Sequence, residues 1–277
     1  MSDVLIRVGN ISFAYDAANP VLRGVSLTVW SGEFLALIGR NGSGKTTLAK
    51  HLNGLLKPSA GQVLVGKADT RTVPVGELAR QVGYVFQNPD HQLFLPTVRQ
   101  EIAYGPARLG LSGTMLDERI DETLERFGLA GMQERHPAVL GRGVRRLTAL
   151  AAIYAMRPRV FVLDEPTGGL DRRFASRLME LLLALANEGH AVVLITHDMR
   201  LVADHAKRVL LLRDGQVVAD DTPAVLFDQP ELLATSGVQP PQVARLAQAL
   251  RPHGMPGGIC TVEGFCTEYM QRLDVTP

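Results

Sequence analysis

Apolar and polar positions divide the chain into short strands and longer helices. Residues 4–8 and 25–29 alternate between apolar and polar side chains, as half-buried strands do, whereas residues 34–38 form a continuous apolar run followed by a glycine. Residues 45–53 have the composition of a helix and stop at Gly54. The pattern therefore predicts a buried strand, a glycine-rich turn and a helix, in that order.

A helical insert is expected at about residues 97–157. Within it, residues 114–127 carry apolar positions three and four apart, the spacing of an amphipathic helix. Beyond the insert, residues 160–163 and 191–195 are short apolar strands separated by a long helix at about 172–188. Because such alternation of strands and helices is typical of a parallel sheet, we expect an α/β fold.

The chain changes character after about residue 222. Arg213-Asp214-Gly215-Gln216 predicts a tight hairpin turn. Beyond Thr222 the predicted segments shorten and prolines become frequent. We therefore divide the chain into a main domain at residues 1–222, which contains the helical insert, and a small accessory extension at residues 223–277.

The balance of charge limits what the surface as a whole can attract. Lysine and arginine total 29 against 28 aspartate and glutamate residues, a net charge of +1. No sequence-wide field therefore draws nucleic acid or anionic lipid to the chain. We expect no nucleic-acid partner, and any binding of phosphate must come from a local motif.

Neither a membrane span nor a disulfide framework is expected. The longest apolar run, at residues 149–156, is far shorter than the roughly 20 residues that cross a bilayer. The first residues lack the basic and apolar stretches of a signal peptide. The two cysteines, Cys260 and Cys266, have no neighbouring ligand set that suggests zinc. We expect a cytoplasmic chain with free thiols.

The strongest chemical signal lies between the buried strand and the helix that follows it. Its residues are Gly39, Arg40, Asn41, Gly42, Ser43, Gly44, Lys45, Thr46 and Thr47. This is the spacing of a phosphate-binding loop, in which glycines let backbone amides point at phosphates and the helix N-terminus adds partial positive charge. We expect Lys45 to reach the terminal phosphates of ATP and the Thr46 hydroxyl to ligate Mg²⁺.

Two adjacent carboxylates follow the strand at residues 160–163. Asp164 is expected to hold Mg²⁺ beside the phosphates. Glu165 would face the terminal phosphate and accept a proton from the attacking water as general base. A bare acidic strand end is the alternative, but the phosphate-binding loop in the same chain favours the catalytic interpretation.

Together these motifs resemble an ABC transporter ATPase over about residues 4–220, and the resemblance implies further roles. Gln87 is similar to the glutamine that touches Mg²⁺ and senses the transmembrane partner. Asp171 resembles a residue of the loop that communicates across the dimer, and His197 resembles the switch histidine at the terminal phosphate. Tyr15 sits where the family places an aromatic ring that stacks on adenine, although an aromatic side chain in a strand is more often simply packed.

A finer resemblance concerns the ATPases of energy-coupling factor importers, which take up vitamins and transition-metal ions such as cobalt. Residues 87–94, 97–98 and 103–106 are similar to theirs, as are residues 230–233 and 240–246 of the tail. In that family the tail often helps to hold two ATPases together. The resemblance implies a peripheral subunit on the cytoplasmic face of the cell membrane, with a transmembrane scaffold protein and a substrate-binding membrane protein as partners. The transported substrate stays open, because the ATPase does not touch it.

One family motif is altered. Where the family has the signature Leu-Ser-Gly-Gly-Gln before a helix, this chain has Leu140, Gly141, Arg142, Gly143 and Val144. In the family, this signature segment caps the ATP bound to the other subunit of the dimer. Gly141 cannot supply the serine hydroxyl. Arg142, Arg145 and Arg146 add positive charge that meets either a phosphate, acidic groups of a partner, or only solvent.

The alteration is one-sided, because the chain's own phosphate-binding loop, metal-binding acid and general base are complete. Losing a contact to the transition-state phosphate costs on the order of a few kcal/mol, roughly a hundredfold or more in rate. A heterodimer with an ATPase that carries an intact signature is therefore favoured over a homodimer. Two other interpretations stay open: a soluble ABC ATPase outside transport, and a regulatory subunit that binds ATP with little hydrolysis.

Overall fold

The computed structural model describes residues 3–16 and 19–273, and its centre is a mixed six-stranded sheet. The strand order is β10, β9, β3, β8, β7 and β6. Strands β9, β3, β8, β7 and β6 are parallel, and only β10 at one edge is antiparallel. The bounds in that order are Gln216–Asp221, Arg208–Arg213, Phe34–Ile38, Ala191–Ile195, Val160–Asp164 and Val82–Val85.

The inner strands are apolar throughout because both of their faces are covered. In β3, Leu35 and Leu37 belong to the core on one face, whereas Phe34, Ala36 and Ile38 pack on the other. All five side chains are buried. This explains why the sequence shows a continuous apolar run here instead of alternation.

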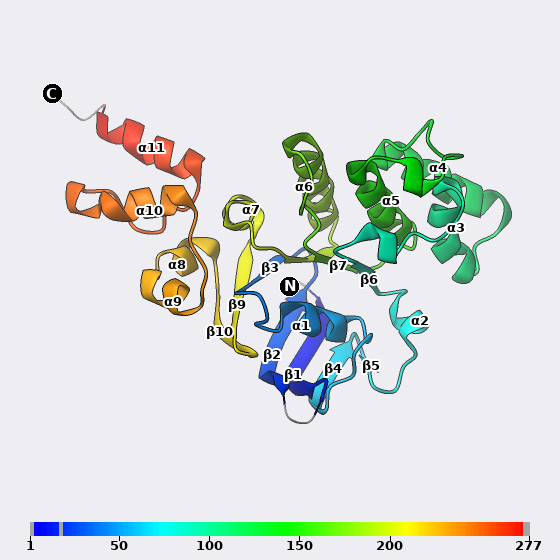
Figure 1. Cartoon of the computed structure of the whole chain (residues 1–277), viewed down its shortest axis with the longest axis horizontal. Coiled ribbons are helices and arrows are strands. Elements are labelled where there is room, and N and C mark those ends of the chain that lie inside the picture. Colours follow the sequence, from blue (N-terminus) through cyan, green and yellow to red (C-terminus); the bar gives the residue numbers. More distant parts are fainter. Residues whose placement is uncertain (1–2, 17–18, 274–277) are drawn as a thin grey trace.

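A second, antiparallel sheet of four strands covers one face of the central sheet (Figure 1). Its order is β2, β1, β4 and β5, with the bounds Pro20–Trp30, Val4–Ala14, Ala60–Val65 and Ala68–Asp69. Helix α1, Lys45–Leu52, contributes Leu48 and Leu52 to the core shared by both sheets. The helix that begins at the glycine-rich turn is thereby fixed on two sides.

Three helices form a unit beside the central sheet, at the right of Figure 1. They are α3, Val98–Arg108, α4, Gly113–Phe127, and α5, Arg142–Tyr154. Their apolar faces share a core with α6, Arg172–Asn187, and with the second face of the central sheet. Short elements precede and follow α3 and α4: α2, Val75–Leu78, and the 3₁₀ helices Pro89–His91 and Pro137–Val139.

Small helices lie on the side of β9 and β10 (Figure 1). They are α7, Met199–His205, α8, Pro223–Phe227, α9, Pro230–Thr235, α10, Gln242–Ala249, the 3₁₀ helix Arg251–His253 and α11, Val262–Leu273. Helix α8 contacts both strands and α7 and α9, and α10 packs against α11. Phe227 and Leu233 are buried against apolar residues of β3 and β9. The extension therefore shares a hydrophobic core with the central sheet.

The predicted fold class is confirmed, with an α/β core, an antiparallel sheet, a helical part and a small C-terminal extension. The predicted hairpin at residues 213–216 joins β9 to β10, with Asp214 and Gly215 both at positive φ. Both cysteines are free thiols, Cys260 buried and Cys266 exposed. Among the described residues, no helix combines the length and the apolarity that a membrane crossing requires. The division at residue 222 stays a prediction.

Candidate functional site

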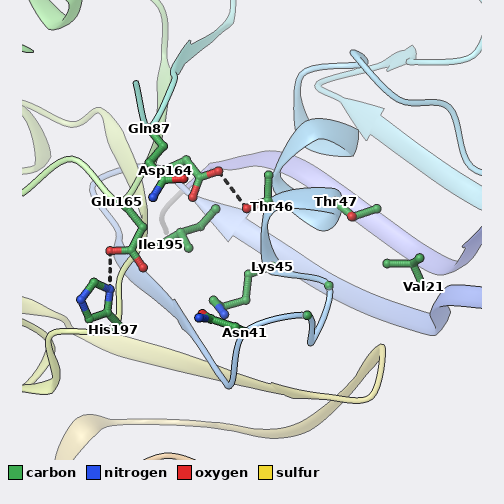
Figure 2. A pocket seen from close by; sticks show the side chains of 12 residues that line it. Val21, Asn41, Lys45, Thr46, Thr47, Gln87, Asp164, Glu165, Ile195 and His197 are labelled. Carbon is green, nitrogen blue, oxygen red and sulfur yellow. Dashed lines mark hydrogen bonds and ion pairs between the residues drawn. The ribbon is translucent and has the colours of Figure 1, made fainter. Parts of the chain in front are cut away.

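A cavity of about 500 Å³ opens where the parallel strands of the central sheet reach their carboxyl ends (Figure 2). Its walls come from the glycine-rich turn, the start of α1, and the ends of β6, β7 and β8. The lining residues are Val21, Asn41, Gly42, Gly44, Lys45, Thr46, Thr47, Gln87, Asp164, Glu165, Ile195 and His197. Segments far apart in sequence meet here because carboxyl ends of parallel strands share one edge of a sheet.

Glycine is required at the start of the turn. Gly39 has φ +145, and a Cβ at this position would lie 2.2 Å from the carbonyl oxygen of Leu212. Gly44 has φ +104, and a Cβ at this position would lie 2.9 Å from Leu22 Cδ2. Only glycine tolerates such backbone angles and close approaches without strain. The turn therefore follows a path that places its backbone around the cavity.

Backbone carbonyl oxygens of the turn hold the Lys45 side chain. Its Nζ donates hydrogen bonds to the carbonyl oxygens of Gly39 at 2.8 Å and Arg40 at 2.9 Å. Burial lowers the pKa of Lys45 from its ordinary value, and the carboxylates of Glu165 and Asp164 partly oppose this shift. The ammonium group is thus an under-solvated cation, suited to an anionic ligand.

Oxygen atoms from three elements meet at Asp164. The Thr46 hydroxyl donates to Asp164 Oδ2 at 2.8 Å, and the Tyr84 hydroxyl lies 3.3 Å from the same oxygen. Gln87 lines the cavity beside them (Figure 2). Magnesium prefers oxygen ligands and is usually held by one or two carboxylates together with substrate phosphates. A hydroxyl, a carboxylate and an amide oxygen fit this pattern, and the described residues contain no all-protein cluster of metal ligands.

Glu165 and His197 face each other across the cavity mouth. His197 Nδ1 lies 2.9 Å from Glu165 Oε2 (Figure 2), with the glutamate side chain 13% exposed and the imidazole 77% exposed. Glu165 has φ +47, an unusual backbone angle for a residue other than glycine. Its amide donates to the carbonyl oxygen of Ile195 on the neighbouring strand. The backbone thereby directs this carboxylate into the cavity.

The remaining predicted nucleotide residues lie around the turn. Tyr15 is 63% exposed, its hydroxyl lies 3.3 Å from that of Thr47, and its ring meets Phe13 edge-on. The Tyr15 side chain is therefore accessible to a ligand. Arg40 points away to an exposed ion pair with Asp214. Among the described residues, the buried Ser43 hydroxyl has no hydrogen-bond partner.

The signature segment and Asp171 do not line this cavity. Gly141 is the N-cap of α5, and Arg142, Gly143 and Val144 form the first turn of the helix. Gly143 packs against Phe174, where an added Cβ would come within 2.5 Å of the ring. Asp171 caps α6, because its side chain accepts a hydrogen bond from the amide of Phe174. The structure thus joins these two motifs to each other at the starts of α5 and α6.

The structure separates three arginines that the sequence left equivalent. Arg145 pairs with Asp90 at 2.6 Å, and Arg146 is buried and bonded to backbone carbonyls. Arg142 is exposed beside Gly169. Sequence reasoning did not assign Arg146 or Tyr84 to the site. The only signal for Tyr84 was its place on the strand before Gln87, which gives no indication of a bond to Asp164.

Comparisons with known proteins identify the family of the chain. A family model described as ABC transporter matches residues 22–168. A protein of Methanothermobacter thermautotrophicus named energy-coupling factor transporter ATP-binding protein EcfA is 41% identical over 272 residues, which is 97% of this chain and 88% of the relative. Its namesake in Methanocaldococcus jannaschii is 38% identical over 250 residues, 89% of each chain.

Solved structures share the fold and contain related cassettes. The structure of cbiO1 from Clostridium perfringens, described as part of the ABC transporter complex cbiONQ, has a TM-score of 0.76 and 29% identity, covering 90% of this chain and 99% of that one. A dimeric cassette in a post-hydrolysis state with ADP and Pi has a TM-score of 0.72 and 27% identity, covering 79% and 99%. The resemblance predicted from the motifs is confirmed: this chain belongs to the ATP-binding subunits of ABC transporters and is an ATPase.

Proposed function

We propose that this ATPase is the motor subunit of an energy-coupling factor type importer. The convergence of Lys45, Asp164, Glu165 and His197 on one cavity is the observation that carries the catalytic part. The importer part is supported by relatives named EcfA that align with nearly the whole chain, tail included. The subunit then works as a peripheral protein on the cytoplasmic face of the cell membrane.

The polar residues that are expected to act on ATP each have a proposed task. The glycine-rich turn and Lys45 bind the phosphates of ATP, and Tyr15 stacks on adenine. Thr46, Asp164 and Gln87 hold Mg²⁺, which supplies charge neutralisation at the phosphates. Glu165 accepts a proton from the attacking water, and His197 donates toward the terminal phosphate.

We further propose that the chain works with a second, different ATPase. The chain's own cavity is complete, whereas its signature segment lacks the serine hydroxyl. Paired with a cassette that has an intact signature, this chain contributes the competent site. The altered segment then closes over the partner's nucleotide, where turnover is slower.

The membrane partners are proposed to dock near Gln87. The segment after Gln87 is tied to α5, since Asp90 pairs with Arg145 and the side-chain amide Nε2 of Gln92 donates to the carbonyl oxygen of Ala149. Phe94 is exposed beside this segment and meets Tyr104 edge-on. A scaffold protein that binds here can move the helical unit, while a separate membrane protein selects the vitamin or metal ion.

A regulatory subunit that binds ATP with little hydrolysis is the second candidate, and the altered signature is the observation that favours it. The two candidates differ in what Glu165 does. If the chain is the motor, Glu165→Gln abolishes ATP-driven uptake while the complex still assembles. If it is regulatory, the same substitution leaves uptake within about twofold of the wild type.

Uptake by cells that co-express the chain with the products of neighbouring genes distinguishes the motor from the regulatory subunit, and also from an ATPase outside transport. Radioactive cobalt, nickel and biotin are the first probes. The motor proposal expects the chain to be purified from detergent-solubilised membranes with a membrane protein, and uptake of one probe to require Lys45 and Glu165. A chain that is recovered without any membrane protein, and whose loss leaves all uptake unchanged, instead supports an ATPase outside transport.

A further inference from the structure

Arg146 is a buried cation on the helix that begins at the signature segment. It is 2% exposed, and its Nη1 and Nη2 donate to the carbonyl oxygens of Glu165 at 2.9 Å and Gly168 at 3.2 Å. Its Nε is buried with no partner among the described residues. Burial lowers the pKa of this guanidinium from its ordinary value. Within residues 3–16 and 19–273 no carboxylate forms a hydrogen bond with it, so the two carbonyl oxygens are its main ligands there.

Stability alone does not account for this arrangement. A buried charge has a desolvation cost that two neutral acceptors offset only in part, and well-packed apolar residues often serve as well or better. The acceptors are therefore the informative feature. They are the two ends of the turn that follows β7, where the Gly168 amide also donates to the carbonyl oxygen of Glu165. Arg146 thus closes a turn whose first residue carries the proposed general base.

Glu165 needs such support because its backbone is strained. Its φ of +47 is disfavoured for a residue with a side chain, and such angles persist where surrounding contacts over-determine them. Three backbone contacts do so here: the Glu165 amide donates to the carbonyl oxygen of Ile195, and its carbonyl oxygen accepts from the Gly168 amide and from Arg146. The Ile195 contact lies within the central sheet and the Gly168 contact within the turn, whereas the Arg146 contact comes from the helical unit.

We propose that Arg146 is a positioning residue for Glu165, holding its carbonyl so that the carboxylate stays aimed at the terminal phosphate. The inference rests on the proposed role of Glu165. If Arg146 has this role, the direction of the Glu165 carboxylate depends on the position of α5. Arg146 lies on this helix, one helical turn after Arg142 of the signature segment. Movement of the helical unit is thereby transmitted to the general base through one side chain.

The test is a double-mutant cycle in the intact chain, with ATP turnover and ATP affinity measured separately. The parent pair, wild type and Glu165→Gln, first establishes that Glu165 is needed for turnover. Arg146→Lys and Arg146→Ala are then made in both backgrounds. In the wild-type background we expect kcat to fall about 10- to 100-fold with the dissociation constant for ATP within about twofold, because small misplacements of a reacting group lower the rate strongly. In the Glu165→Gln background we expect no further fall.

Chemical rescue separates positioning from folding. Guanidinium chloride at a few millimolar, far below denaturing concentrations, should restore part of the kcat of Arg146→Ala, whereas ethylammonium should not. If Arg146→Ala folds only when guanidinium is added, the same guanidinium titration reports both folding, from the melting transition, and kcat. A restored melting transition without restored kcat overturns the proposal. Equal rate losses in both backgrounds, or wild-type kcat in a folded Arg146→Lys protein, also overturn it.

The cycle distinguishes this inference from the function on which it rests. Turnover that survives Glu165→Gln removes the assigned base before Arg146 is tested. A chain that fails to support uptake but gives the expected cycle loses the importer assignment and keeps the positioning role. Arg145→Ala is the matched control, since Arg145 is the neighbouring arginine on α5 and pairs with Asp90 instead of the turn. It should leave the coupling between positions 146 and 165 unchanged.

Discussion

The hydroxyl of Thr46 donates a hydrogen bond to Asp164 Oδ2 at 2.8 Å, although 118 positions separate the two residues in the chain. The contact joins the first turn of α1 to the end of β7. The fold thus brings together two oxygen atoms that are proposed as metal ligands, and substitutions there should alter ligand binding and rate more than the fold.

Replacing Lys45 by alanine should remove the stabilisation that ATP gives. In the wild type, nucleotide at about 100 times its dissociation constant adds about 2.7 kcal/mol, or roughly 5–10 °C in Tm for a chain of this size. Lys45→Ala loses the main cation at the phosphates and should shift by less than about 2 °C in differential scanning fluorimetry. Lys67→Ala, an exposed lysine in the turn between β4 and β5, is the control and should keep the full shift.

Tyr84 should make the fold sensitive to alkaline pH. Burial, and next the charge of Asp164, raise the pKa of Tyr84 above its ordinary value of 10.0. Above pH 10 the folded state keeps a proton that the unfolded state loses. The contribution of Tyr84 to the free energy of unfolding is therefore full below pH 10 and falls as the pH rises above 10. Urea unfolding at pH 9 and at pH 11 should show the wild type losing about 1.4 kcal/mol more than Tyr84→Phe over this whole interval, because the unfolded tyrosine is only half ionised at pH 10.

The control for that series is Tyr104→Phe, which removes a hydroxyl from an exposed ring. Its free energy of unfolding should stay parallel to the wild type over the whole pH range. If Tyr84→Phe also stays parallel, ionisation of Tyr84 is not linked to folding and the contact with Asp164 has no influence on it.

Tyr15 should contribute to ATP affinity through its ring and not through its hydroxyl. Stacking of a base on an aromatic side chain is worth about 1–3 kcal/mol, so Tyr15→Ala should weaken ATP binding roughly 5- to 100-fold. Tyr15→Phe keeps the ring and should bind within about twofold of the wild type in equilibrium dialysis. Tripolyphosphate, which has no base, should bind all three proteins alike; equal weakening for it would assign the effect to the phosphate site instead.

Substitution of Gly143 should destabilise the fold, whereas substitution of Gly141 should not. A Cβ at Gly143 would lie 2.5 Å from the Phe174 ring, so Gly143→Ala should destabilise the fold by about 1–3 kcal/mol in urea unfolding. At Gly141 an added Cβ meets nothing within 4 Å. Gly141→Ser, which places a favoured N-cap residue at the start of α5, should therefore stay within about 0.5 kcal/mol of the wild type. Equal effects of the two substitutions would contradict the packing of α5 on α6.

Much of the nucleotide cavity could be predicted from the sequence because its signals are local. The glycine spacing at residues 39–47 needs a strand before it and a helix after it, and both were visible in the apolar pattern. The carboxylates at 164 and 165 are marked by their place at a strand end. In each case the chemistry and the structural context lie within about ten residues of each other.

Contacts between distant segments could not be predicted in this way. Nothing in the pattern around Tyr84 indicates that its hydroxyl reaches Asp164 on the adjacent strand. Arg142, Arg145 and Arg146 look alike in sequence, yet the rotation of about 100° between neighbours on α5 brings Arg145 to Asp90 and Arg146 to the turn after β7, while Arg142 lies one helical turn before Arg146. Strand ends were also missed, since β1 continues to Ala14 through irregular pairing with β2.

Steady-state ATP hydrolysis tests the central claim most directly. It should be measured with Mg²⁺ on the purified chain alone and on the complex co-expressed with its genomic neighbours, for the wild type, Glu165→Gln, and a triple variant that restores the family signature with Gly141→Ser, Arg142→Gly and Val144→Gln. We predict weak activity of the chain alone, an increase with an intact-signature partner or with the restored signature, and loss of about a hundredfold or more in Glu165→Gln. Brisk hydrolysis by the chain alone that signature repair leaves unchanged would contradict the account.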